Sequence, residues 1–442
     1  MRDHIVEKVK SAGVVGAGGA GFPTHVKVNA DVETVLVNGA SCEPLLMSDP
    51  YLLEDETELV VRGLEAVVEC TGAKSGIICL KGKHSKAMEA VAQAIAKDTT
   101  GKIKMFELKD FYPAGDEQVL VREVLGKTVP EAGIPLQVGV VVSNVESLLN
   151  IALALEDKPV TDRYVTVTGE VRKPMIVKVP VGTSADVVIG YAGGSLISDY
   201  RVVDGGPMMG RILEKLNAPV TKTTSGLIVL PPEHNVVARK IMEPAKVRRI
   251  TNMICCQCSQ CTDLCPRNLL GHALHPHKLM RALDFTQSGV ESKKEALLCS
   301  ECGICEKFAC PMMISPREVN AQIKKELAAD GIRWDSTGEK PINHPFREDR
   351  YIPTKRLMQR LDVIKYDTHP VFEGEVSSDR VVISLNQHIG APSFAVVSVG
   401  DTVNKGDLIG EIPENALGAR IHASIDGQVE SIENGSVTIG NL

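Results

Sequence analysis

The chain is short of aromatic residues. Phe, Trp and Tyr together make up 4% of its 442 residues, and there is a single Trp. Few rings are therefore available to stack on nucleic acid bases. The chain also lacks an excess of positive charge, because its formal net charge is −7. Binding to a phosphate backbone requires clustered basic charge, so both shortages argue against nucleic acid as a partner.

Long apolar runs are absent as well. The longest candidates, residues 76–80 and 138–142, have the length of strands, whereas a membrane-spanning helix needs roughly 18 apolar residues. The chain is charged from Arg2 onward and has no apolar signal-peptide core. We therefore expect a cytoplasmic protein without a membrane span. In that compartment cysteines stay reduced, and clusters of them indicate metal sites rather than disulfides.

The size and composition predict several folded domains. A chain of 442 residues is too long for one core, and as a prior it implies about three domains. Hydrophobic residues make up 43% and charged residues 24% of the sequence. These fractions are ordinary for globular proteins, so we expect little disorder.

Eight of the twelve cysteines fall into two runs, each ending in Cys-Pro. The first run is C-x2-C-x2-C-x3-C-P, the bacterial ferredoxin pattern, and the second has one extra residue before its last cysteine. Such runs predict two [4Fe–4S] clusters, in which the fourth thiolate of each cluster comes from the other run. The predicted ligand sets are Cys255, Cys258, Cys261 and Cys310 for one cluster, and Cys299, Cys302, Cys305 and Cys265 for the other.

The alternative for these cysteines is zinc, which also binds four cysteines at C-x2-C spacing. Zinc sites use pairs of such cysteines and do not need a third in register, so the two triplets favour iron–sulfur. Cys256 lies beside Cys255 but is out of register, and we interpret it as a bystander. Cys70 and Cys79 are isolated and are expected to be small buried hydrophobic residues.

A glycine-rich segment lies near the start of the chain. Its four glycines are Gly16, Gly18, Gly19 and Gly21. The dinucleotide fingerprint requires a strand before such glycines and a helix after them. Here residues 5–9 have helical spacing, and the next clear element is a strand at 34–37, so an ordinary Rossmann turn is not expected. Glycine lets the backbone approach a ligand, and Lys27 could neutralise a phosphate. The segment predicts a site for a phosphate or a flat ring, with a purely structural turn as the alternative.

Several segments together resemble a known group of proteins. Residues 16–27 resemble the flavin-binding loop of the FMN-carrying, NADH-oxidising subunit of respiratory complex I, and more closely that of the RnfC electron-transport proteins. Residues 37–44, 112–118 and 143–146 match further segments of these proteins in the same order. Residues 164–194 resemble the β-grasp SLBB domain, and the cysteine runs follow. The resemblance covers nearly the whole chain.

The resemblance implies a non-covalent FMN site with NADH as electron donor. The residues implied to hold FMN are Gly16, Gly18, Gly19, Gly21, Lys27, Asn38 and Asn144. Phe22 is implied to stack on the nucleotide. Glu43, together with Asp116 or Glu117, is implied to lie close to the flavin and the nicotinamide, which makes these three the catalytic candidates. Ala17 stands where the complex I loop has Arg.

Residues 379–442 are rich in Val, Ile and Gly, and their short strands and glycine turns predict a small all-β module. The pattern resembles a barrel-sandwich hybrid, the fold of biotinyl and lipoyl carriers. The turn at 413–420 has no lysine, so we expect a docking or structural module rather than a carrier. We expect it to fold independently and to be unnecessary for electron transfer within the chain.

The order of these parts resembles that of the cobalamin reductases of propanediol-utilisation microcompartments, because RnfC proteins usually carry the hybrid module first. We therefore expect an α/β multidomain chain. Its expected parts are a Rossmann-like FMN/NADH-binding domain of the complex I type (1–158), a β-grasp SLBB domain (159–235), an α-helical ferredoxin-like domain with two [4Fe–4S] clusters (240–330), a linker with a short helix near 355–365 (331–378), and an all-β barrel-sandwich hybrid module (379–442).

The resemblance implies a flavin–iron–sulfur oxidoreductase that passes electrons from NADH through FMN and two clusters to cobalamin, in support of a B12-dependent diol dehydratase. The implied partners are cobalamin or a cobalamin-handling enzyme and a shell protein, within or at the shell of a cytoplasmic microcompartment; homo-oligomerisation is left open. One alternative is an RnfC-like protein that feeds electrons to a membrane complex. Another is a non-enzymatic adaptor with structural clusters that docks to a shell.

Overall fold

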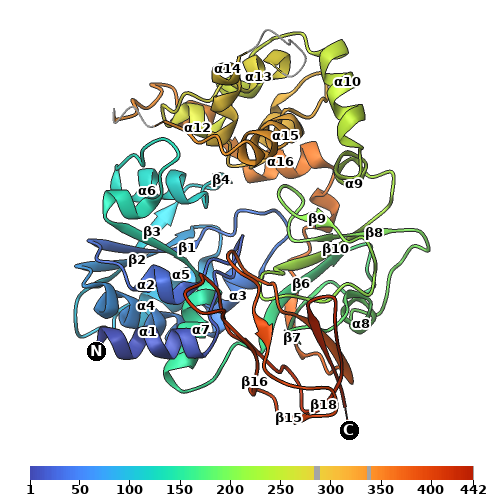
Figure 1. Cartoon of the computed structure of the whole chain (residues 1–442). Helices are drawn as coiled ribbons and strands as arrows, with labels where there is room; N and C mark the ends of the chain where they lie inside the picture. The colour runs from blue at the N-terminus through green and yellow to red at the C-terminus, as the bar shows by residue number, and fades with distance from the viewer. Residues whose placement is uncertain (283–288, 336–339, 442) are drawn as a thin grey trace.

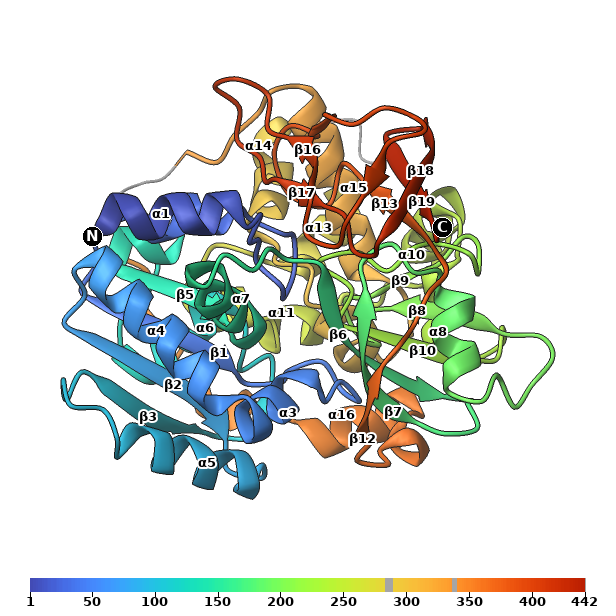
Figure 2. The ribbon, with the colours of Figure 1, turned by 90° about the horizontal axis from the view of Figure 1, so that it is seen from below.

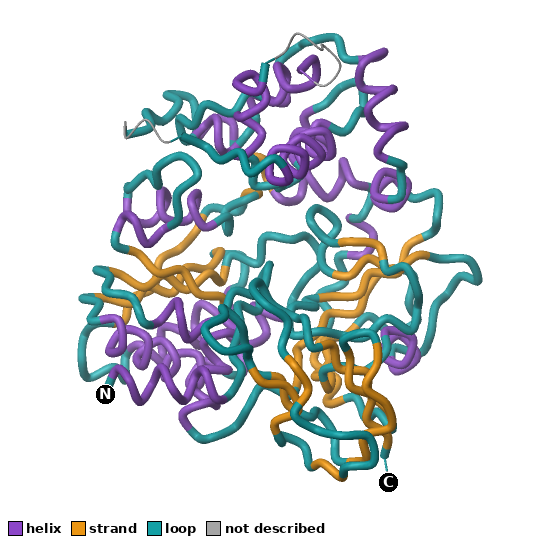
Figure 3. The backbone as a smooth tube through the Cα atoms, in the orientation of Figure 1, coloured by secondary structure: helices purple, strands orange, loops and turns teal. Residues whose placement is uncertain are grey.

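The computed structural model describes residues 1–282, 289–335 and 340–441. Four parts are visible in Figure 1: an α/β part at the left, a second sheet at the right, a helical end at the top and a small β module at the bottom. Helices and loops gather at the top, whereas the sheets occupy the rest of the molecule (Figure 3). Among the helices in the described residues, none is both long and apolar enough to cross a membrane.

The N-terminal part is built on a four-stranded parallel sheet of order β3-β2-β1-β5. Its strands are β1 (Thr34–Gly39), β2 (Ser75–Lys81), β3 (Ile103–Leu108) and β5 (Val140–Asn144). Its helices are α1 (Arg2–Ser11), α2 (Thr24–Val28), α3 (Ser48–Asp55), α4 (Thr57–Thr71), α5 (Ser85–Ile95), α6 (Glu117–Leu125) and α7 (Val145–Leu155). The helix expected around residues 5–9 is confirmed as α1. The short helix α2 was not expected.

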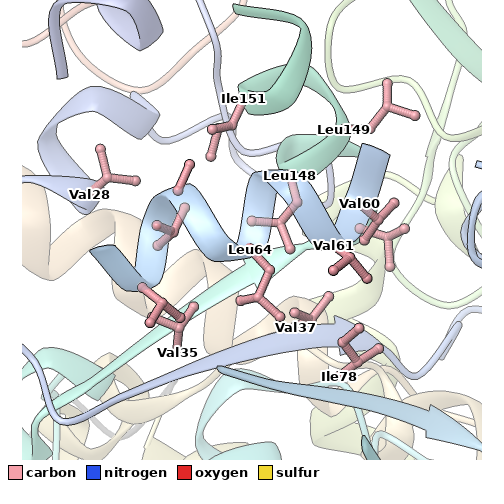
Figure 4. Close-up of a cluster of buried hydrophobic side chains, with 14 of the residues drawn as sticks. Val28, Val35, Val37, Val60, Val61, Leu64, Ile78, Leu148, Leu149 and Ile151 are labelled. Atoms are coloured by element: carbon pink, nitrogen blue, oxygen red, sulfur yellow. The ribbon is translucent and has the colours of Figure 1, made fainter. Parts of the chain in front are cut away.

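Successive side chains of β1 point to opposite faces of this sheet, so both faces carry a core. Val35 and Val37 join the cluster formed by α4 and α7, whereas Leu36 faces α6. Figure 4 shows Leu64 of α4 and Leu148 of α7 pointing into the first cluster. Burying a side chain of this size contributes about 1.5–3 kcal/mol. The helices α4 and α7 lie side by side along the sheet (Figure 2).

The second part is a six-stranded sheet of order β12-β7-β6-β10-β8-β9, with α8 (Ala185–Tyr191) packed on its core. Its strands are β6 (Asp162–Gly169), β7 (Met175–Pro180), β8 (Arg201–Asp204), β9 (Arg211–Ile212), β10 (Gly226–Leu230) and β12 (Val371–Glu375). The edge strand β12 comes from the segment expected to be a linker. That expectation is wrong for these residues, because β12 pairs in parallel with β7.

The helical end carries the cysteine runs. Its helices are α9 (Asn235–Lys240), α10 (Pro244–Ile254), α11 (Gln260–Asp263), α12 (Pro266–Leu269), α13 (Pro276–Ala282), α14 (Val290–Lys294) and α15 (Pro316–Ala329). Val247, Leu279 and Ile323 form the centre of its core. The helix expected near 355–365 is present as α16 (Thr354–Leu361). It follows β11 (Ile352–Pro353), which pairs with β4 (Phe111–Tyr112), so this segment also packs on the body.

The C-terminal module consists of two small sheets, of order β13-β19-β18-β15 and β14-β16-β17. Its strands are β13 (Arg380–Ser384), β14 (Phe394–Ala395), β15 (Thr402–Val403), β16 (Leu408–Glu411), β17 (Ile421–His422), β18 (Gly427–Glu433) and β19 (Ser436–Gly440). The module lies at the end of the molecule opposite to the cysteine helices (Figure 1).

The expectation that this module stands apart from the body is wrong. Val181 of the second part lies inside the module's own core. Ser424 Oγ donates to Val181 O at 2.5 Å. The buried Lys222 donates from Nζ to Gly13 O at 2.7 Å and to Arg420 O at 2.8 Å, which links three parts of the chain at one ammonium group. A buried donor of this kind needs such acceptors, so the module is built into the body.

Candidate cofactor sites

Two of the predicted flavin contacts lie side by side at one edge of the N-terminal sheet. Asn38 ends β1, Asn144 ends β5, and the two residues are paired in the parallel register. The chain runs from β1 to β2 and β3 on one side and returns to β5 on the other side. This reversal is a topological switch point, where open parallel sheets leave a crevice for ligands outside the carboxyl ends of their strands.

The glycine loop is close to this edge. Gly16 N donates to Phe22 O at 2.9 Å, which closes the loop between α1 and α2. Gly18 lies against Asn144, and a Cβ at position 18 would come within 3.0 Å of Asn144 Nδ2. Gly19 has a φ of +132°, a backbone conformation that favours glycine. The loop precedes β1 instead of following a strand, so the interpretation that it is not an ordinary Rossmann turn is confirmed.

Asn144 is held in one orientation by its neighbours. It caps α7, with Oδ1 accepting from Glu146 N at 2.9 Å. Its Nδ2 donates to the Asp49 oxygens at 3.2 and 3.1 Å. Burial raises the pKa of Asp49, and the amide of Asn144 partly offsets this effect. The amide is therefore fixed before any ligand binds.

Arg163 of β6 anchors the glycine loop from the second part of the chain. Its Nη2 donates to Ala17 O at 2.8 Å and its Nε to Thr224 O at 2.6 Å. It also forms an ion pair with Glu146, and the two side chains are only 3% and 1% exposed. Removing one partner of such a buried pair costs about 3–5 kcal/mol. Glu146 thus positions Arg163, and Arg163 positions the loop.

Lys27 and Glu117 lie together near the same edge. Lys27 Nζ donates to Val142 O of β5 at 2.8 Å and lies 3.7 Å from Glu117 Oε1. The Glu117 side chain is half exposed. Asn38 Nδ2 donates to Gly115 O at 2.8 Å, which holds the 112–118 segment against β1. A cation, an accessible carboxylate and two amides therefore surround the crevice.

Asp116 is already occupied on both oxygens. It caps α6 by accepting from Gln118 N and Val119 N at 3.1 and 3.2 Å. Its carboxylate also forms a two-pronged ion pair with Arg267, at 2.6 and 3.0 Å. Arg267 follows Cys265 and Pro266 directly. Asp116 therefore fastens the N-terminal part to the cysteine part, and Glu117 is the more accessible of the two acidic candidates.

Glu43 also makes contacts between parts of the chain. Its carboxylate accepts from Met208 N at 2.9 Å and Met209 N at 2.7 Å. Lys240 of α9 donates to Met208 O at 3.2 Å. Burial raises the pKa of Glu43 and lowers that of Lys240 to about 7. Glu43 thus holds the loop at 206–210 between the N-terminal part and α9.

The eight predicted ligands line two cavities, as the crossed assignment requires. The outer cavity, of about 320 Å³, is lined by Cys255, Cys258, Cys261 and Cys310. The inner cavity, of about 300 Å³, is lined by Cys265, Cys299, Cys302 and Cys305. Within the described part of the chain, no three Cys, His, Asp or Glu side chains converge as one zinc ion would require. Four thiols around a cavity suit a cubane.

The two cysteine runs repeat the same backbone conformation. Gln257 and Ser259 in the first run have positive φ values of 56° and 62°. Glu301 and Gly303, at the matching positions of the second run, have φ values of 58° and 81°. A left-handed conformation is uncommon for residues other than glycine. Its occurrence at equivalent positions indicates that the two loops are built for the same kind of ligand.

The extra residue of the second run forms a π-helical turn over Cys305–Ala309. A π turn accommodates one more residue than an α turn, and such turns are frequent at functional sites. The first run has the short helix α11 at the equivalent place. The insertion is therefore absorbed between the third and fourth cysteines, and Cys310 still reaches the outer cavity.

The inner cavity is the one that adjoins the N-terminal part. Tyr112 OH donates to Cys302 O at 2.6 Å. The ion pair of Asp116 with Arg267 lies beside Cys265, another residue of this cavity. The crevice, the inner cavity and the outer cavity thus form a connected series. Cys258, in the outer cavity, is exposed.

Sequence reasoning missed three residues that hold these sites: Asp49, Arg163 and Arg267. Only Arg267 had a local signal, because it follows a Cys-Pro pair. Arg163 reaches Ala17, far away in the sequence, and Asp49 reaches Asn144 from a separate helix. No spacing rule links such pairs.

A Gly19→Val substitution is expected to abolish flavin binding. A Cβ at this position meets no protein atom within 4 Å, so the side chain would fill the open space in front of the loop and strain a φ of +132°. Flavin absorbance of the purified protein measures the outcome. Gly101→Val is the matched control, because Gly101 has a φ of +66° and open space but lies in a remote turn. Normal flavin content in Gly19→Val would contradict the loop assignment.

Comparison with known proteins supports the same division of the chain. Four family models match it: the Nuo51 FMN-binding domain (residues 9–153), the SLBB domain (164–212), the 4Fe-4S dicluster domain (254–315) and the RnfC barrel sandwich hybrid domain (367–441). The expected fold class and the FMN and iron–sulfur cofactors are confirmed by these matches.

Cobalamin reductase PduS of Salmonella typhimurium is 44% identical over 442 aligned residues, covering 99% of this chain and 96% of that protein. The chain belongs to the PduS cobalamin reductase family. The RnfC-type component of the Na(+)-translocating ferredoxin:NAD(+) oxidoreductase complex of Acetobacterium woodii is 35% identical over 273 residues, covering 60% of this PduS family member and 58% of that component.

A solved structure of an NAD+-reducing [NiFe]-hydrogenase in the H2-reduced state is also similar to this PduS family member, with a TM-score of 0.50 and 21% identity. The similarity covers 74% of this chain and 61% of that one. At this identity the likeness concerns the fold alone.

Proposed function

We propose that this protein transfers electrons from NADH to cobalamin. One observation carries the proposal: the switch-point crevice and the two cysteine cavities form a connected series in a member of the PduS cobalamin reductase family. Two cob(III)alamin molecules would accept the two electrons of one NADH, giving two cob(II)alamin, NAD+ and one proton. The residues present suit both cofactors, because the glycine loop leaves open space before Gly19 and four thiols line each cavity.

The proposed FMN-binding residues are those of the glycine loop together with Lys27, Asn38 and Asn144. Bound FMN supplies the conversion between two-electron hydride chemistry and one-electron transfer. Lys27 places a positive charge beside the crevice, and Asn144 offers an amide that Asp49 has already oriented. Glu117 is the proposed acidic group near the nicotinamide, and Phe22 the proposed stacking residue.

In this scheme Asp116 and Glu43 are positioning residues. Asp116 caps α6 and binds Arg267, and Glu43 binds the loop at 206–210. The proposed ligands of the two [4Fe–4S] clusters are the four cysteines of the inner cavity and the four of the outer cavity. Clusters carry one electron each, so their place beyond the crevice suits transfer to a one-electron acceptor such as cobalt.

A second candidate function is electron input to a membrane complex, favoured by the similarity to the Acetobacterium woodii component. An anaerobic assay of the purified protein with NADH distinguishes the two. We expect faster reduction of cob(III)alamin than of ferredoxin or a quinone, followed by the absorbance change of the corrinoid. Reduction of ferredoxin alone would favour the second function. NADH oxidation with no acceptor at all would leave neither.

We also propose that the protein acts with a cobalamin-handling enzyme and a shell protein, in the cytoplasm within or at a microcompartment shell. Membership of the PduS family and the order of the four parts support this proposal. Immunoblotting of microcompartments purified from the native host tests it, and absence of the protein from the shell fraction would contradict it.

A further inference from the structure

Apolar side chains are exposed around the outer cavity. They are Met253 and Ile254, directly before Cys255, and Met312 and Met313, shortly after Cys310. Met253 is 77% exposed, and Met312 also lines the cavity. Methionine is flexible and polarisable, so it suits a surface that makes transient contacts with a partner. We call these four residues the methionine surface.

A basic rim flanks the methionine surface on two helices. Lys246, Arg249 and Met253 follow one another at spacings of three and four residues along α10, so they lie on one exposed stripe. Lys278 and Arg281 are exposed on α13, next to His277 and Met280, which line the outer cavity. Neither helix contains an acidic residue.

This local charge differs from that of the whole chain. The formal net charge is −7, yet the two helices beside the outer cavity carry only basic and neutral residues. The segments 255–261 and 310–316, which contribute its cysteines, carry no charged residue. An uncharged centre with a basic rim is thus set on an acidic protein.

Such a surface is suited to brief, oriented encounters. Complementary charge accelerates association and aligns the partners, and an apolar centre excludes water where the two surfaces meet. The inner cavity cannot serve this purpose, since Cys265, Cys302 and Cys305 are buried beneath the N-terminal part. The outer cavity is the one whose cysteine Cys258 is exposed.

We propose that the methionine surface and its basic rim form a docking surface for a redox protein whose acceptor group is surrounded by acidic residues. The inference rests on the proposed function, because it assigns the outer cavity to the last site before the partner. It identifies the partner by charge: a protein with an acidic face, bound transiently.

Binding of cytochrome b5, a haem protein with an acidic face, provides the test. The holoprotein is titrated with oxidised cytochrome b5 by biolayer interferometry at low and at high ionic strength. We expect saturable binding that weakens with salt, because exposed charges are screened. The Lys246→Glu/Arg249→Glu double variant should bind at least about tenfold more weakly at low salt. Cytochrome c, which has a basic face, should bind the double variant more tightly than the wild type.

The matched control reverses two exposed lysines at the opposite edge of the N-terminal sheet. Lys74 precedes β2 and Lys102 precedes β3, at the amino ends of the strands. Lys74→Glu/Lys102→Glu changes the net charge by the same amount as the first double variant. It should leave binding of cytochrome b5 within about twofold of wild type. Equal weakening by both double variants, or none by the first, overturns the docking surface.

A second measurement separates this inference from the proposed function. NADH-dependent reduction of menadione, a small neutral quinone, should be the same in both double variants and in the wild type, with unchanged flavin and iron content. Loss of menadione reduction in the wild type would contradict the NADH-oxidising function, while the salt-dependent binding of cytochrome b5 would remain.

Discussion

Replacing Cys302 by Ala is expected to lower the iron and acid-labile sulfide content from about eight to about four of each per chain. Cys302 is buried and lines the inner cavity, so no water or exposed side chain can replace its thiolate. Replacing Cys258 by Ala should remove the four irons of the outer cavity instead. Iron and sulfide analysis of anaerobically purified protein measures both losses.

The control for this experiment is the neighbouring thiol Cys256. It lies at the rim of the outer cavity and is exposed, but it is out of register with the second run. Cys256→Ala should retain about eight irons. Loss of four irons from this variant would show that the register of the first run is wrong. A full complement of iron in Cys302→Ala would remove the inner cavity from the scheme.

A chain that ends after Ser378 is expected to lose its flavin and much of its stability. The truncation removes Ile389, whose N–H donates to Gly21 O in the glycine loop at 3.3 Å. It also removes Arg420 O, one of the two acceptors of the buried Lys222 ammonium. Val181 loses the apolar cluster that surrounds it. An unpaired buried donor and an exposed core each cost on the order of 1–3 kcal/mol.

A full-length variant tests the same contact without removing the module. Gln387 Oε1 accepts from Lys222 N at 2.8 Å, and Gln387 O lies next to Gly21. Gln387→Ala should weaken FMN binding several-fold, measured by fluorescence titration of the flavin-free protein. Arg380→Ala breaks an exposed pair with Glu430 elsewhere in the module and should leave binding unchanged. Full flavin retention in both the truncated chain and Gln387→Ala would show that the module only decorates the body.

Parts of the sites with regular local spacing could be predicted from the sequence. The crossed cysteine sets depend on intervals of two to four residues, and the cavities group the thiols in the same sets. The glycines of the loop are equally local. Asp116 was harder, because its partner Arg267 is in another part of the chain. An acidic residue beside a glycine has the same pattern whether it contacts a ligand or an arginine.

The placement of the C-terminal module could not be predicted for the same reason. Strand and turn signals define its strands, but its attachment depends on Val181 and Lys222, which belong to the second part. The π-helical turn is an intermediate case. The sequence contained the extra residue, while the form it takes depends on the buried surroundings of Glu306 and Lys307.

The contact between Gly21 and Ile389 has a consequence for biogenesis. The glycine loop is among the first segments to leave the ribosome, and the residues that pack on it are among the last. Domains generally fold as units during synthesis, N-terminal first, but here the first sheet must wait for the end of translation to acquire its final wall. Contacts between such distant segments also form slowly. The nascent chain therefore matures its nucleotide crevice after release, when the whole polypeptide is available.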